Sequence, residues 1–199
     1  MRLRTERLEL RLPTEEELVQ LAHVAERGVH PPDEMPFMTA WTDGIGKPEF
    51  VDSFVEFHLT QRREWRPDAW HLLLGVWAEG ELAGSQGAEL RAPGTAETGS
   101  WLGQAFQGRG NGTEMRTAIL ELFFRGLGGD VATSGALEGN LSSARVSAKL
   151  GYESAGEEFV SPRGEPVRAE RFRLRRERWQ PPFPVEIVGL ERCLPLFGL

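Results

Sequence analysis

The chain has 199 residues, of which 40% are hydrophobic and 27% are charged, and this composition is typical of a globular protein with one main domain. Its formal net charge of −7 argues against general nucleic-acid binding, which needs a basic surface that displaces counterions from phosphates. The sequence has no apolar run long enough to cross a membrane, and its first residues lack the apolar segment of a signal peptide. We therefore expect no membrane partner and a cytoplasmic location.

The first third of the chain predicts one strand and two helices around an irregular segment. Leucines alternate with charged residues near the start, which is typical of a half-buried strand, and Thr14 followed by Glu17 matches a helix capping box. After the first helix, proline and glycine exclude a long regular element, and large apolar side chains there indicate a loop that fills a gap or lines a pocket. The expected elements are a strand over 7–12, a helix over 14–28, a loop over 29–46 and a helix over 48–66.

The rest of the chain predicts further strands and two more helices. Met115, Ile119 and Phe123 recur at helical spacing, whereas the other segments alternate or form short apolar runs. The expected elements are two strands within 70–90 joined at 79–80, a strand over 96–102, a helix over 113–127, a strand over 130–137, a helix over 142–150 and a hairpin of strands over 152–160 and 167–175. This order favours an α/β protein with a central mixed sheet and helices on both faces.

The last residues form a separate apolar segment. Pro181, Pro182 and Pro184 mark a break, and the residues after them are too apolar to lie free in solvent but too few to fold alone. We therefore divide the chain into a domain over 1–179 and a C-terminal appendage over 180–199. The appendage packs on its own body or, as the alternative, on a partner chain in a homodimer.

The stretch AFQGRGNGTEM, residues 105–115, places Gly108, Gly110 and Gly112 directly before a helix. Glycine is costly in regular structure, but a glycine-rich turn lets backbone N–H groups converge at a helix N-terminus, where the helix dipole adds positive charge. The pattern favours a phosphate-binding turn over a plain flexible connection. Its G-x-G-x-G spacing, followed by Thr113 and no lysine, fits neither a P-loop nor a dinucleotide fingerprint.

Two motifs resemble those of the GNAT superfamily of acyl-CoA-dependent N-acetyltransferases. QGRGNG, residues 107–112, is similar to the Q/R-x-x-G-x-G/A pyrophosphate loop of that family. EGNLSSARVSAKLGYE, residues 138–153, is similar to the N-x-x-S…K-x-G-F/Y stretch of its RimJ/RimL branch, and the start TERLELRLPTEEEL also resembles that branch. The resemblance covers roughly residues 5–178 and implies a GNAT-like fold, in which a mostly antiparallel, splayed mixed sheet carries helices on both faces.

The resemblance implies that acetyl-CoA, or another acyl-CoA, is the co-substrate. Backbone amides of the glycine stretch would hold the CoA pyrophosphate, the strand over 100–102 would pair with the pantetheine arm, and Asn140 would bond to that arm. Arg145 is a weaker candidate for the nucleotide phosphates. The implied cofactor-binding residues are Ser100, Trp101, Leu102, Gln107, Gly108, Arg109, Gly110, Asn111, Gly112, Thr113, Asn140, Ser143 and Lys149.

The resemblance also implies catalytic roles for Leu102 and Ser143. The backbone N–H of Leu102 would polarise the thioester carbonyl as an oxyanion hole does, and Ser143 would protonate the departing thiolate. The acceptor would be a primary amine, either a protein N-terminus or a small molecule. Only a neutral amine attacks, so a base is needed.

The sequence leaves the base open. Some relatives carry Glu, Tyr and Glu at three positions where this chain has Gly135, Ser147 and Ala155. The remaining acidic candidates are Glu89, Glu97 and Glu138.

No metal is expected, because the chain has neither an H-E-x-x-H pair nor a cluster of cysteine and histidine. Among the scattered histidines only His30 is a candidate for substrate contact, and Cys193 has no expected role. Two alternatives to an acetyltransferase remain. The first is an acyl-CoA sensor that lacks a base. The second is an enzyme for a bulkier donor such as succinyl-CoA, with Arg91 or an arginine of the last hairpin facing the acyl end.

Overall fold

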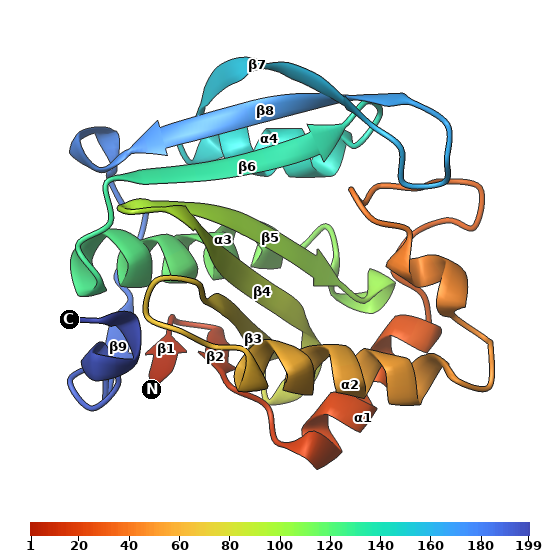
Figure 1. Cartoon of the computed structure of the whole chain (residues 1–199), viewed down its shortest axis with the longest axis horizontal. Coiled ribbons are helices and arrows are strands. Elements are labelled where there is room, and N and C mark those ends of the chain that lie inside the picture. The colour runs from red at the N-terminus through yellow and green to blue at the C-terminus, as the bar shows by residue number, and fades with distance from the viewer.

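The computed structural model describes residues 1–199, and its centre is a nine-stranded sheet in the order β7-β8-β6-β5-β4-β3-β2-β1-β9 (Figure 1). Neighbouring strands are antiparallel except β5 and β6, which are parallel. The predicted mixed, mostly antiparallel sheet is therefore confirmed. The strands are β1 (Arg2–Arg4), β2 (Leu8–Arg11), β3 (His71–Ala78), β4 (Glu81–Ala92), β5 (Thr95–Leu102), β6 (Val131–Leu137), β7 (Glu153–Val160), β8 (Val167–Arg175) and β9 (Glu186–Val188).

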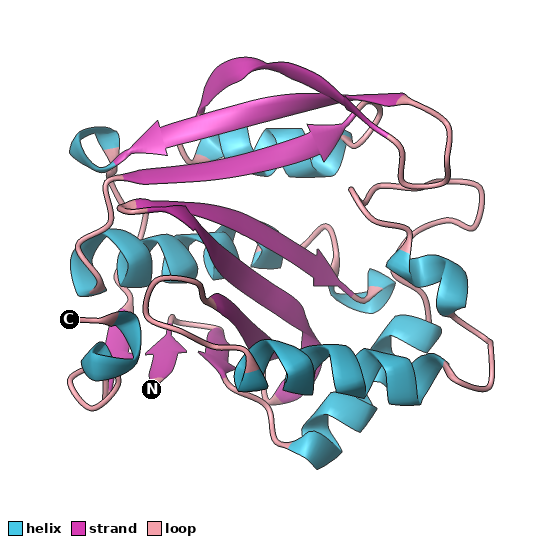
Figure 2. Ribbon diagram, in the orientation of Figure 1, coloured by secondary structure: helices cyan, strands magenta, loops and turns pink.

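Helices cover both faces of this sheet (Figure 2). The α-helices are α1 (Glu15–Glu26), α2 (Phe50–Arg63), α3 (Asn111–Glu121) and α4 (Leu141–Lys149). Leu18 and Phe54 pack α1 and α2 together on one face, whereas Ile119 places α3 in a larger apolar cluster on the other face. The helix predicted to end at residue 127 is correct in extent, but its last turn, Leu122–Gly126, is π-helical.

Alternation along the strands produces these two apolar layers. In β3, Leu72, Leu74 and Val76 are buried in the cluster of α3, because successive side chains of a strand point to opposite faces. The turn between β3 and β4 lies at Glu79 and Gly80, as predicted, and both residues have positive φ angles of 51° and 85°. Such angles are typical of a two-residue hairpin turn.

The N-terminal strand prediction was partly wrong. The single strand expected over 7–12 is β2, and a further strand, β1, precedes it and pairs with it. Leu3 of β1 is fully buried between two exposed arginines. A three-residue strand carries too short an alternation to be recognised from sequence.

The C-terminal segment lies against the same edge of the sheet as the N-terminus. β9 pairs with β1, so Ile187 lies opposite Leu3. Further on, the ring of Phe197 packs edge-on against Trp65 and Trp70, with ring centroids 5.1 and 5.3 Å apart. None of the helices is both long and apolar enough to span a bilayer.

Candidate acyl-CoA cleft

A cleft of about 640 Å³ opens where β5 and β6 separate. The two strands pair only over Thr95–Glu97 and Val131–Thr133, and beyond these residues they diverge (Figure 1). The loop over 29–46 and the N-termini of α3 and α4 form the other walls. The sheet is therefore splayed, as predicted, and the cleft follows from that splay.

The end of β5 presents an unpaired backbone edge to the cleft. Gly103 N donates to Ala83 O at 2.9 Å, so the strand alternation turns the peptide groups of Ser100 and Leu102 away from β4. The carbonyl of Leu102 accordingly accepts a bond of 2.7 Å from Gln107 Nε2 on that side. An extended ligand in the cleft would meet the N–H groups of Ser100 and Leu102.

The glycine stretch forms a tight turn at the N-terminus of α3. Gly108 and Gly110 have φ angles of +73° and +85°, which L-residues rarely adopt, and Gly110 is the N-cap of the helix. The turn is held from outside, since Arg7 Nη1 donates to the carbonyl of Arg109 at 2.9 Å. Arg7 also pairs with the buried carboxylate of Glu114. With this carboxylate neutralised, the first turn of α3 remains suited to an anion.

The N-terminus of α4 lies across the cleft from this turn. Asn140 caps α4, because its Oδ1 accepts from Ser143 N at 3.1 Å, and its Nδ2 donates to Pro36 O at 3.0 Å. Asn140 thus ties the 29–46 loop to the helix. Ser143, Arg145 and Lys149 line the cleft from the same helix.

Most of the residues selected from the sequence meet in this cleft, but two lie beside it. Asn111 is buried and its Nδ2 donates to Phe106 O at 3.0 Å, and the side chain of Arg109 does not line the cleft. Gln107 binds the chain twice, since its Nε2 also donates to Val29 O at 2.7 Å. The lining includes Ser100, Trp101, Leu102, Gln107, Gly108, Gly110, Gly112, Thr113, Asn140, Ser143, Arg145 and Lys149.

The three carboxylates considered as bases are all ion-paired. Glu138 pairs with Arg168 at 2.7 Å, and Glu89 pairs with Arg91 at 2.9 Å. Burial alone would raise the pKa of Glu97, yet its hydrogen bonds and ion pairs with Arg171 and Arg91 lower that pKa. A carboxylate held in this way is a poor proton acceptor.

His71, at the start of β3, lines the cleft and was missed by sequence reasoning, because a lone histidine at a strand end carries no motif. Its Nδ1 lies 3.2 Å from Gln61 Oε1, an acceptor, so Nδ1 carries the hydrogen and Nε2 has the lone pair. Burial lowers the pKa of His71, and the Arg91 charge lowers it further against the opposing charges of Glu89 and Glu97. The ring is therefore neutral at pH 7.

Aromatic side chains form the wall of the cleft on the α1/α2 side. Trp101 of β5 packs against Trp41 and Phe54, with ring centroids 5.4 and 6.2 Å apart. His30 supports this wall, since its Nδ1 donates to Pro31 O and its Nε2 accepts from Thr42 Oγ1, both at 2.8 Å. Because both nitrogens are occupied, His30 has no lone pair for a substrate proton.

Gly135 and Ser147 stand where some relatives carry catalytic groups. A Cβ atom at Gly135 would come within 2.4 Å of Met38 Cε and 2.7 Å of Arg171 Nη1, so a larger side chain there requires both of these side chains to move. Ser147 is fully buried, and its hydroxyl has no partner. No group of three or more His, Cys, Asp or Glu side chains could hold a metal ion.

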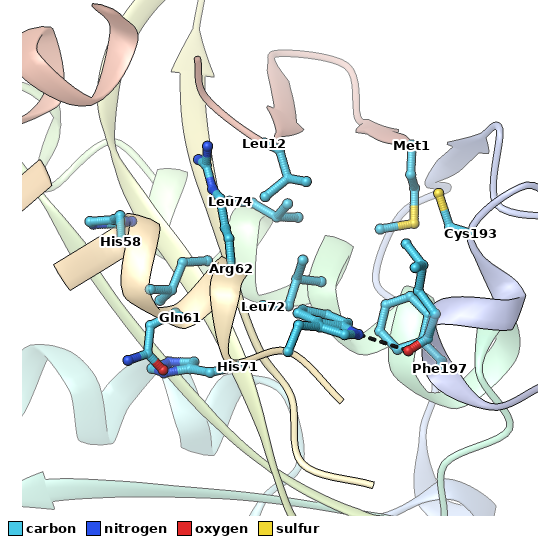
Figure 3. A pocket seen from close by; sticks show the side chains of 13 residues that line it. Met1, Leu12, His58, Gln61, Arg62, His71, Leu72, Leu74, Cys193 and Phe197 are labelled. Atoms are coloured by element: carbon cyan, nitrogen blue, oxygen red, sulfur yellow. Dashed lines mark hydrogen bonds between the residues drawn. The ribbon is translucent and has the colours of Figure 1, made fainter. Parts of the chain in front are cut away.

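A second, apolar cavity of about 430 Å³ lies between α2, the start of β3 and the C-terminal segment (Figure 3). It exists because β2 ends beside Gly75, leaving His71–Leu74 without a strand on that side. Trp65 Nε1 donates to Leu196 O at 2.7 Å across one wall. His71 lines this cavity as well as the cleft, but none of the residues predicted from the sequence does, so the cleft is the candidate functional site.

A family model described as an acetyltransferase (GNAT) domain matches residues 7–153 of the chain. The chain belongs to this family.

Solved structures share the fold of this GNAT domain. RimJ of Mycobacterium smegmatis in complex with CoA-disulfide has a TM-score of 0.70 and 17% identity, over 89% of this chain and 87% of that chain. The ribosomal-protein-S5-alanine acetyltransferase from Vibrio fischeri has a TM-score of 0.67 and 16% identity, over 91% and 100%. The microcin C7 self-immunity acetyltransferase, in complex with acetyl-CoA and AMP, has a TM-score of 0.66 and 16% identity, over 86% and 93%.

At these low identities the likeness shows the fold, and it includes a RimJ protein and a ribosomal-protein acetyltransferase. The prediction of a GNAT domain with a RimJ/RimL-like fold is confirmed.

Proposed function

We propose that the protein transfers the acyl group of acetyl-CoA to a primary amine, by direct attack within a ternary complex. The observation that carries the proposal is the meeting of two features in one cleft. The glycine turn at the start of α3 offers converging N–H groups for a pyrophosphate, and the free edge of β5 offers a strand-like partner for the pantetheine arm. Structural relatives bind CoA or acetyl-CoA, which supports the donor.

The donor side would use mainly backbone groups. Amides from Gly108 to Gly112 would hold the pyrophosphate, with Thr113, whose N–H donates to Gly110 O at 3.0 Å, closing the turn behind them. Lys149 and Arg145 would face the nucleotide phosphates. Asn140 would contribute by fixing the start of α4 and the 29–46 loop beside the pantetheine arm, since both ends of its amide are already bonded.

In the chemical step the amine nitrogen forms a bond to the thioester carbon, and the carbon–sulfur bond breaks. The N–H of Leu102 would stabilise the carbonyl oxygen as it gains negative charge. We assign His71 Nε2 as the base that takes the amine proton, because it is neutral, lines the cleft and has a free lone pair. Ser143 would donate its proton to the leaving thiolate and regain one from solvent, while His71 releases the amine proton to solvent.

The acceptor would enter from the α1/α2 side of the sheet. Trp101, Trp41 and Phe37 give this side an aromatic wall, and Glu34 lines the cleft beside them. Such a wall fits the apolar part of a small amine or of an N-terminal peptide.

Turnover can be tested by following thiol release from acetyl-CoA with a panel of amines and N-terminal peptides. Ser143→Ala should lower kcat at least tenfold, in line with the loss of an acid group. Ser53→Ala on the exposed face of α2 is the control. A protein that fails to bind CoA in calorimetry would overturn the proposal.

A second candidate is an acyl-CoA sensor, and it is favoured by one observation: every carboxylate predicted as a base is neutralised by an arginine. Tight CoA binding without turnover on any amine would support this candidate over the enzyme.

A further inference from the structure

Arg116 of α3 is a buried cation without an acidic partner. Only 4% of the residue is exposed, and no carboxylate lies within ion-pair distance of its guanidinium. Nη1 donates to Ser134 Oγ at 3.0 Å and Nη2 to Ser100 Oγ at 3.1 Å, whereas Nε has no partner. Burying such a charge is costly unless an anion compensates it. The chain itself does not provide that anion.

This guanidinium bridges the two strands just past the point where they separate. Ser100 lies in β5 and Ser134 lies in β6, and Arg116 lines the cleft between them. The surroundings are polar as well as buried. Thr98 Oγ1 donates to Thr133 O at 3.1 Å and therefore accepts from the hydroxyl of Tyr152, also at 3.1 Å.

Tyr152 adds a hydroxyl to these polar surroundings. Burial raises the pKa of Tyr152, and the neighbouring Arg116 charge opposes this rise. The hydroxyl therefore stays protonated at neutral pH. The end of the cleft where β5 and β6 separate thus holds buried hydroxyl groups and a guanidinium, which is an unusual environment for the methyl group of an acetyl donor.

Two other arginines that face this end of the sheet are neutralised, whereas Arg145 lines the cleft from α4. Arg91 pairs with Glu89 and Glu97, and Arg171 pairs with Glu97 and Glu158. The sequence suggested Arg91 or an arginine of the last hairpin for the acyl end, and Arg171 belongs to that hairpin. The charges of these two arginines are used within the chain. Arg116 is therefore the buried arginine between β5 and β6 that has no acidic partner.

We propose that the cleft accepts, besides acetyl-CoA, acyl-CoA donors whose acyl group ends in a carboxylate, and that Arg116 pairs with this carboxylate. The proposal rests on the proposed function, because it needs the thioester to lie along β5. A guanidinium offers two parallel N–H groups that match a carboxylate, and the two serine hydroxyls can rotate to donate as well. Arg116 acts from the α3 face, opposite Trp101 and the acceptor wall, which favours the donor over the acceptor as the source of the carboxylate.

The test compares succinyl-CoA with butyryl-CoA, whose acyl chain has the same number of carbons without the charge. We expect the wild-type protein to bind succinyl-CoA ten- to a hundredfold more tightly than butyryl-CoA, as expected for a charge-assisted pair. In Arg116→Met this ratio should fall to about one, and in Arg116→Lys it should be partly kept. Arg125→Met, an exposed arginine after α3, is the matched control and should keep the wild-type ratio.

Calorimetry with these ligands needs no turnover, so the outcome is separate from that of the proposed function. Equal wild-type affinity for succinyl-CoA and butyryl-CoA would overturn the inference even if acetyl transfer is observed. A ratio that stays high in a folded Arg116→Met protein would overturn it as well. If that variant does not fold, the wild-type comparison and Arg116→Lys still decide. Absence of binding by free CoA would instead reject the proposed function.

Discussion

At the scale of single residues, the two left-handed glycines of the turn have the clearest structural need. Gly110 has a φ angle of +85°, and a Cβ atom there would lie 3.3 Å from Arg7 Nη2, which braces the turn. A side chain would therefore both strain the backbone and displace its brace. The N–H groups of the turn would no longer converge.

We expect Gly110→Val to weaken CoA binding at least tenfold, measured by calorimetry, because a β-branched residue is strongly disfavoured at this φ angle. Gly80→Val is a matched control, since Gly80 has the same φ angle of +85° in the β3–β4 hairpin, where a Cβ atom meets nothing within 4 Å. The control should lose stability but keep CoA affinity. Equal loss of affinity in both variants would contradict a specific role for the turn.

The assignment of His71 as base predicts a pH effect. Because burial lowers the pKa of His71 below its usual 6.5, the ring is neutral above that pH and gains a proton as the pH falls. The value of kcat/KM for the acceptor should therefore fall as the pH drops below 6.5 and the ring gains its proton. His71→Gln should remove this ionisation from the profile. His23→Gln, at an exposed position of α1, should keep the profile. A His71→Gln profile identical to wild type would exclude the role.

Sequence reasoning found the glycines but not the partners of the polar residues. Asn140 was recognised by its motif, whereas its cap on α4 and its bond to Pro36 depend on a loop more than a hundred residues away. Glu97 was a candidate base from its sequence position, but its ion pairs with Arg91 and Arg171 could not be predicted. Arg171 is 74 positions away in the sequence. The burial of Arg116 could not be predicted, because a charged residue in a helix is usually exposed.

At the scale of elements, the start of α1 was predicted in detail. Thr14 and Glu17 form the expected capping box, with Glu17 N donating to Thr14 Oγ1 at 3.2 Å. The structure adds Arg11, whose guanidinium donates to both carboxylate oxygens of Glu17 at 2.6 and 2.7 Å. This ion pair joins β2 to the helix that follows it.

The pair predicts acid sensitivity. Hydrogen bonds from Arg11, helped by Thr14, lower the pKa of Glu17 to about 2 from a usual value near 4.5. The carboxylate therefore stabilises the fold fully above pH 4.5, and this contribution is lost as the pH falls towards 2. Urea unfolding should show Glu17→Gln less stable than wild type at pH 7 and nearly equal to it at pH 2. Glu16→Gln, exposed in the same turn, should show no such trend.

Elements shorter than four residues escaped prediction. β1 and β9 have three residues each, and each is stabilised mainly by its ladder to a neighbour rather than by its own pattern. The long elements were predictable because their alternation or helical spacing continues over several turns or residue pairs. The divergence of β5 from β6 was implied only by the family resemblance. The residues of a strand do not determine how far it pairs with its neighbour.

At the scale of the whole molecule, the two ends of the chain complete one edge of the sheet. Met1, β1 and β9 lie together there, and Phe197 packs under Trp70 of the main apolar cluster. The boundary we set at residue 179 and the possible homodimer stay predictions. In the structure the C-terminal segment packs on its own chain, through the pairing of β9 with β1 and the contacts of Phe197.

We expect Phe197→Ala to lower the free energy of unfolding by about 3 kcal/mol, because it removes a buried ring from contact with two tryptophans. Leu196→Ala is the neighbouring control: Leu196 is 56% exposed, so its loss should cost less than about 1 kcal/mol. Urea denaturation of both variants provides the comparison. If both substitutions lowered the free energy of unfolding equally, the ring of Phe197 would not be part of the core.

The splay of β5 and β6 also leaves a signature in hydrogen exchange. The amides of Ser100 and Leu102 lie in the middle of a nine-stranded sheet, yet they face the cleft, whereas those of Gly99 and Trp101 face β4. In the free protein, alternate amides of a single strand should therefore exchange with deuterium at very different rates. A donor that pairs with β5 would slow only the fast ones. Exchange at every second residue of β5 would then report whether the ligand site is occupied, without any need for turnover.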